Sequence, residues 1–131
     1  MTLELSSDVM QRLLDEAANA HPRECCGVLI GAGSRIEEIV PAANVHAEPG
    51  RHFEIDPQAL IDAHRTARAG GPQVLGYYHS HPNGRTGPSP RDAELAAGDG
   101  AVWAIIAAGG VTFWRSGDGG FHALPYVVRE R

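Results

Sequence analysis

The chain has 131 residues, the length of one domain, and no linker or repeat divides it, so residues 1–131 are expected to form a single domain. Its apolar fraction of 43% and charged fraction of 21% are those of an ordinary globular protein. A net charge of −5 without a basic stripe argues against nucleic-acid binding, and no apolar run reaches the ~18 residues of a membrane span.

The N-terminus and the cysteines indicate the compartment. Residues 1–10 lack the basic start and apolar stretch of a secretory signal. Cys25 and Cys26 are adjacent, and neighbouring cysteines rarely form an unstrained disulfide. In a strand their side chains point to opposite faces. We therefore expect reduced thiols in a cytoplasmic protein.

Helical spacing and capping residues predict three helices. Val9, Leu13 and Ala17 recur at helical spacing behind a serine-rich start, and Pro22 ends that pattern. Two later pairs, Asp56-Pro57 and Ser89-Pro90, are typical of an N-cap followed by proline at the first helical position. These patterns predict helices over residues 7–20, about 57–69 and 91–97.

Short apolar runs bounded by glycines and turn residues predict the strands. They lie at residues 26–31, 35–40, 74–79, 102–107, 111–115 and 121–128, with a further extended segment through Val45 and 52–55. The expected fold is α+β: one mixed, mostly antiparallel sheet with two or three helices.

The segment from Gly76 to Pro82 contains the first sign of chemistry, His79 and His81. Residues two apart in extended backbone project to the same side, so the two imidazoles are expected to converge. Asp92 lies beyond a Gly/Pro-rich loop that can fold back toward them. Two imidazoles and one carboxylate suit a catalytic zinc, which keeps a fourth position open. An ordinary pair at a strand end, with one ring buried and one solvated, remains the alternative.

The spacing of these residues resembles a known signature. His79-Ser80-His81, seven residues, Ser89, two residues and Asp92 match the pattern His-x-His-x7-Ser-x2-Asp of the JAMM (MPN-plus) zinc metallopeptidases. That family also has a glutamate between the first helix and the first core strand, where Glu24 stands. The resemblance covers nearly the whole chain and is to the compact bacterial type. It implies a cytidine-deaminase-like, partly barrel-like JAMM/MPN architecture.

The resemblance also implies roles. His79, His81 and Asp92 would hold one Zn²⁺ per chain, Glu24 would be the general base that passes a proton to the leaving amine, and Ser89 would donate a hydrogen bond to the oxyanion. Two plainer interpretations stay open: Glu24 as a solvated residue beyond a helix end, and Ser89 as an N-cap. The two roles of Ser89 can coexist.

For the substrate, the resemblance implies hydrolysis of a peptide or isopeptide bond, often after the C-terminal Gly-Gly of a ubiquitin-like protein. A chain of 131 residues has little room for the insertions that hold ubiquitin in eukaryotic members. Its compactness is similar to that of bacterial members that act on sulfur-carrier proteins, and such a carrier is the expected partner. The sequence does not indicate the oligomeric state.

The sequence leaves three rival functions open. The chain could be a catalytically silent scaffold of the same fold, or a zinc-binding module without turnover. It could also be a cysteine hydrolase that uses Cys25 or Cys26, although Cys26 begins an apolar run and a nucleophilic cysteine needs an electropositive, partly exposed setting. Trp103 and Trp114 are expected to pack in the core.

Overall fold

The computed structural model describes residues 1–130, which form one eight-stranded sheet and three helices. The sheet order is β7-β6-β5-β4-β2-β3-β1-β8, and four of its seven strand pairs are antiparallel. The elements are β1 (Leu3–Ser6), α1 (Ser7–Ala20), β2 (Cys26–Ala32), β3 (Arg35–Ala42), α2 (Pro57–Arg68), β4 (Gln73–Ser80), α3 (Pro90–Leu95), β5 (Val102–Ala107), β6 (Gly110–Gly117), β7 (Gly120–Ala123) and β8 (Tyr126–Arg129). The α+β prediction with a mixed, mostly antiparallel sheet is confirmed.

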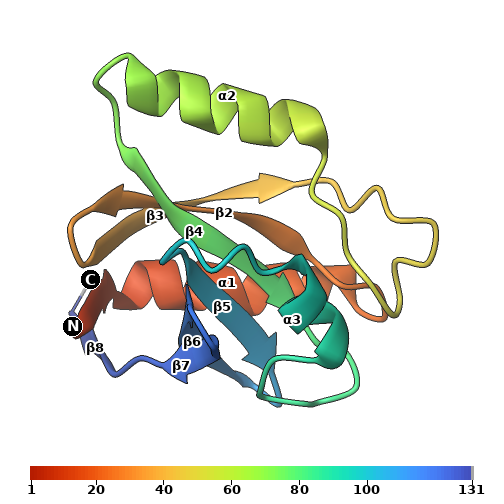
Figure 1. Cartoon of the computed structure of the whole chain (residues 1–131). Helices are drawn as coiled ribbons and strands as arrows, with labels where there is room; N and C mark the ends of the chain where they lie inside the picture. Colours follow the sequence, from red (N-terminus) through yellow and green to blue (C-terminus); the bar gives the residue numbers. More distant parts are fainter. Residues whose placement is uncertain (131) are drawn as a thin grey trace.

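Helices α1 and α2 lie on opposite sides of the sheet (Figure 1). The larger core cluster is on the α1 side, where Val9 and Leu13 of the helix pack against buried residues of the sheet such as Leu29. The second cluster, on the other side, joins Cys26, Phe53, Ile55 and Trp103, with Leu60 of α2 packed against it. The candidate chemistry lies in this second layer.

The central strand β4 pairs with β2 on one side and with β5 on the other. Gly76 makes the second pairing possible, because a β-carbon at this position would overlap the backbone carbonyl of Val102 in β5. Close approach of two backbones is a common reason for glycine inside a strand. The pairing fixes the end of β4, where the two histidines stand.

One strand prediction was wrong, one extended segment pairs only at its ends, and one strand was missed. Around residues 45–55 no full strand forms, but Asn44 bridges Ile55 and the N–H of Val45 donates to the carbonyl of Glu54 at 2.9 Å. The run 121–128 is broken into β7 and β8 at Pro125, whose missing N–H prevents continuous pairing. Strand β1 pairs in parallel with β3 and β8, a non-local arrangement that four residues of sequence do not reveal.

The helix predictions agree closely with the structure. Helix α1 has the predicted bounds, and Ser6 caps it by accepting a hydrogen bond from the N–H of Val9 at 3.1 Å. Helix α3 ends at Leu95, earlier than expected. No helix within residues 1–130 has the length and apolar character that a bilayer crossing requires.

Candidate metal centre

Three side chains converge where β4 ends and α3 begins. Nε2 of His79 lies 3.0 Å from Nε2 of His81. The two nitrogens lie 3.1 Å from the carboxylate oxygens Oδ1 and Oδ2 of Asp92, respectively. All three residues are buried, and they form a group whose ligand atoms lie within 4.8 Å of one another. The predicted convergence of the histidines with Asp92 is present.

The spacing of these atoms fits a tetrahedral ion. Ligands at ~2.0–2.1 Å from a tetrahedral zinc are roughly 3.3 Å apart, close to the distances found here. Two imidazole nitrogens and one carboxylate oxygen leave one of four positions open, which is the arrangement of catalytic rather than structural zinc sites. The donor set therefore fits Zn²⁺ without rearrangement of the backbone.

Hydrogen bonds outside the group orient two of the three side chains. Nδ1 of His81 lies 2.9 Å from the carbonyl oxygen of Arg85, so Nδ1 carries the proton and Nε2 is available to a metal. The backbone N–H of Ser89 donates to Oδ2 of Asp92 at 2.9 Å, while Oγ of Ser89 accepts from the N–H of Asp92 at 3.0 Å. This capping box fixes Asp92 on the first turn of α3.

The protonation states also suit a cation. Burial lowers the pKa of His79, which favours the neutral imidazole that metals bind. Burial alone would raise the pKa of Asp92, but hydrogen bonds from His79 and His81 outweigh it and hold that pKa well below its usual value. Burial alone would lower the pKa of His81, but the hydrogen bond between His81 and Asp92 and the other contacts of this ring together outweigh it, and the pKa of His81 is raised.

Aromatic rings enclose His79. The ring of Phe53 stacks on it with a centroid distance of 4.2 Å and an interplanar angle of 18°. Trp103 meets it edge-on at 5.7 Å. Trp103 is buried as predicted, and it also contacts a candidate ligand. Phe53 was not predicted as a site residue, because only the fold of the loop before α2 brings it to β4.

Glu24 reaches the group through the β2–β4 pairing. Cys26 pairs with His79, so the same antiparallel register continued by two places sets Glu24 opposite His81. Two further hydrogen bonds join the strands beyond that pair, from the N–H of Cys25 to Oγ of Ser80 at 2.8 Å and from the N–H of Ser80 to the carbonyl of Cys25 at 3.1 Å. Residues directly opposite in an antiparallel pair project to the same face.

The environment of Glu24 suits proton transfer. Glu24 is 7% exposed, which excludes the solvated position that the sequence left open. Burial raises the pKa of Glu24 to about 7, the charge of His81 lowers it in part, and the charge of Asp92 raises it further. A carboxylate with a pKa near the working pH is an effective general base.

Ser89 has the N-cap role that the sequence allowed. Its hydroxyl oxygen accepts one hydrogen bond, from Asp92, and the residue is half-buried. A serine hydroxyl also has one proton to donate. Capping therefore leaves the donor free, and the two roles are compatible.

Comparison with known proteins supplies the family. A family model described as prokaryotic homologs of the JAB domain matches residues 6–117. The chain belongs to this family. The JAB-family protein is 33% identical over 114 residues to a desampylase of Haloferax volcanii, a match that covers 82% of each chain.

Two further proteins are similar to this JAB-family protein. A probable TtuB-protein conjugate cleaving protease of Thermus thermophilus is 40% identical over 93 residues, which are 70% of this chain and 59% of that relative. A JAB1/MPN domain protein of Archaeoglobus fulgidus has a similar structure, with a TM-score of 0.63 and 21% identity over 96% of this chain and 97% of the other. The structural similarity to the JAB1/MPN domain protein supports the JAMM/MPN fold predicted from the sequence.

The cysteines of the JAB-family protein lack the setting of a nucleophile. Cys25 and Cys26 belong to the two different core clusters, as expected for neighbours in extended backbone. Burial raises the pKa of Cys25 to about 11 and that of Cys26 to about 12. Since the thiolate is the reactive form, the structure disfavours the cysteine-hydrolase interpretation.

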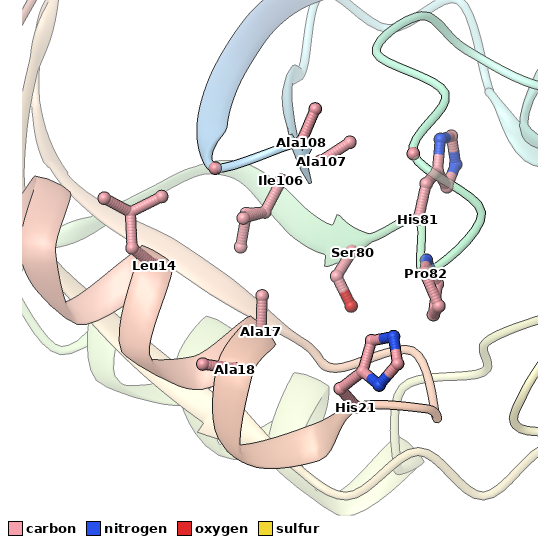
Figure 2. Close-up of a pocket in the computed structure, with 12 residues that line it drawn as sticks. Leu14, Ala17, Ala18, His21, Ser80, His81, Pro82, Ile106, Ala107 and Ala108 are labelled. Atoms are coloured by element: carbon pink, nitrogen blue, oxygen red, sulfur yellow. The ribbon is translucent and has the colours of Figure 1, made fainter.

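One hollow in the JAB-family protein, of about 660 Å³, lies on the α1 side of β4. Figure 2 shows the Ser80 hydroxyl directed toward His21, whereas the His81 ring turns away from it. A second hollow of about 380 Å³ is on the opposite side, where Phe53 and Trp103 line it next to His79. His81 lines the first hollow, whereas His79 contacts Phe53 and Trp103 of the second, so the metal-ligand group lies between the two hollows.

Proposed function

We propose that this JAB-family protein is a zinc-dependent hydrolase that cleaves the peptide or isopeptide bond after the C-terminal Gly-Gly of a ubiquitin-like, sulfur-carrier type protein. The observation that carries the proposal is the group of His79, His81 and Asp92 at tetrahedral spacing, with the buried carboxylate of Glu24 opposite His81. Bound zinc lowers the pKa of water and polarises a carbonyl group.

Two residues of the chain carry out proton transfer and stabilise the developing negative charge. Glu24 accepts the proton of the attacking water and delivers it to the leaving amine, a contribution typically worth ~10²–10⁴ in rate. Ser89 donates its hydroxyl proton to the oxygen on which negative charge develops, and the loss of such a donor costs ~10²–10³ in proteases. Its N-cap geometry holds that hydroxyl on a rigid turn. With all five residues present and grouped, a scaffold without turnover is the weaker interpretation.

The substrate class is supported by the relatives. One is named a desampylase and another a probable TtuB-protein conjugate cleaving protease, so a protein conjugate is the common substrate we infer. The candidate ligands are at most 7% exposed. A scissile bond that has to approach so recessed a centre favours residues without side chains on the acyl side, and Gly-Gly meets that need.

The proposal is tested with candidate carrier proteins that bear a short peptide or a lysine-linked peptide beyond Gly-Gly. Mass spectrometry after incubation with zinc-loaded protein is expected to show cleavage directly after the second glycine. A matched carrier with Ala-Val in place of Gly-Gly is the control and is expected to stay intact. Intact Gly-Gly carriers together with efficient cutting of unrelated peptides would refute the carrier substrate and leave a general metallopeptidase.

A further inference from the structure

The loop between β3 and α2 is organised around one side chain, Asn44. Its Oδ1 accepts hydrogen bonds from the N–H groups of His46 and Glu54, both at 3.1 Å. Its Nδ2 donates to the carbonyl oxygens of Glu24 and His52, both at 3.0 Å. The amide therefore uses both of its donor protons and both of its acceptor positions. Because the partners are N–H groups on one side and carbonyls on the other, they also fix which amide atom is which.

One of these bonds, together with a backbone bond to Pro49, holds the proposed general base. The carbonyl of Glu24 accepts from Asn44, and the N–H of Glu24 donates to the carbonyl of Pro49 in the same loop at 2.7 Å. Both backbone groups of Glu24 are thus bonded to the loop rather than to a neighbouring strand. The position of the carboxylate depends on the conformation of the loop.

The other bonds hold the ring that stacks on His79. The carbonyl of His52 and the N–H of Glu54 flank Phe53 on either side, so Asn44 fixes the backbone at both of its neighbours. Phe53 is 9% exposed and lies flat on the His79 ring.

This ring is unusual among the candidate ligands. Nδ1 of His79 is buried and has no hydrogen-bond partner within residues 1–130. Metal-binding histidines are normally oriented by a hydrogen bond from that second nitrogen. Here the contacts with Phe53 and Trp103 take its place.

We propose that Asn44 is a positioning residue that sets the general base and a metal ligand together, through one loop. The inference rests on the proposed function for the roles of Glu24 and His79. An aspartate at position 44 would keep the size and the two acceptor contacts, but it would lose both donors and would turn a carboxylate oxygen toward two carbonyls. The loop would then be released at Glu24 and at Phe53 simultaneously.

The test compares Asn44→Asp and Asn44→Ala with Asn19→Asp, a control at an exposed position of α1. Three quantities are measured on zinc-loaded protein: the exchange rate of the Glu24 amide by NMR, the rate of zinc transfer to a chelator, and kcat on a Gly-Gly conjugate. Both Asn44 variants are expected to raise the first two rates and to lower kcat by ~10-fold or more, the usual size of effects from groups that orient ligands. Asn19→Asp is expected to behave as wild type.

Phe53→Leu separates the effect of the loop on His79 from its effect on Glu24. This variant is expected to accelerate zinc transfer, while Glu24 amide exchange stays at the wild-type rate. Wild-type zinc transfer and wild-type amide exchange in both folded Asn44 variants would overturn the proposal. These two readouts need no substrate. If the wild-type protein cleaves no conjugate, the proposed function fails, while the positioning role of Asn44 is still decided by exchange and metal release.

Discussion

Replacing Glu24 by glutamine is expected to lower turnover of a Gly-Gly conjugate by at least ~10²-fold while one zinc per chain stays bound. Glutamine has nearly the same shape but cannot accept a proton. The buried position and the raised pKa of about 7 identify Glu24 as the group prepared for that transfer. Because only the ionised carboxylate acts as a base, wild-type turnover is also expected to rise with pH on the acid side of neutrality.

The matched control is Glu37→Gln, which removes an exposed carboxylate from β3 and is expected to leave turnover unchanged. Metal content and single-turnover rates are measured on the same preparations. Turnover near the wild-type rate in zinc-loaded Glu24→Gln would mean that another group accepts the proton. Loss of zinc from that variant would instead assign Glu24 to the metal site.

Removing a ligand is expected to abolish metal binding rather than slow the chemistry. His79→Ala and Asp92→Ala should reduce zinc from about one per chain to near zero, because two remaining side chains cannot hold the ion at a three-ligand site. The thermal stabilisation that zinc gives the wild-type protein should vanish with it, since a ligand stabilises only the state that binds it. Elemental analysis and thermal melts with and without zinc measure both effects.

Asp92 needs a second variant because it also belongs to the capping box of α3. Asp92→Ala loses the capping contact, worth ~1 kcal/mol, in addition to the ligand. Asp92→Asn keeps an oxygen that can accept from the N–H of Ser89 but lacks the negative charge, so it separates metal binding from helix capping. His122→Ala, at an exposed position of β7, is the control for His79→Ala. Unchanged zinc in both alanine variants of the ligands would contradict the ligand assignment.

Short sequence patterns predicted those parts of the site whose geometry depends on neighbouring residues alone. His79 and His81 converge as their spacing in extended backbone requires, and the Ser89-Pro90 pair marked the start of the helix that carries Asp92. Glu24 could be identified only by its order in the family signature, because the β2–β4 register that brings it to His81 joins segments more than 50 residues apart.

The residues that hold the site in place, Asn44 and Phe53, could not be predicted from the sequence. The segment around Val45 was predicted to be extended, but only its two ends pair, through the Asn44–Ile55 bridge, and the side chain of Asn44 holds the residues between them in a loop. Asparagine is common in loops, and nothing in its sequence context distinguishes a residue whose side chain makes several hydrogen bonds from one whose side chain makes none. The contact between Phe53 and His79 likewise depends on tertiary structure alone.

The most direct test of the account is the cleavage of a Gly-Gly conjugate by wild-type protein of measured zinc content, before and after treatment with o-phenanthroline or iodoacetamide. We expect about one zinc per chain, loss of cleavage with the chelator, recovery when zinc is returned, and no effect of iodoacetamide on the buried thiols. Cleavage that survives removal of the metal, or that iodoacetamide abolishes while zinc stays bound, would contradict the account.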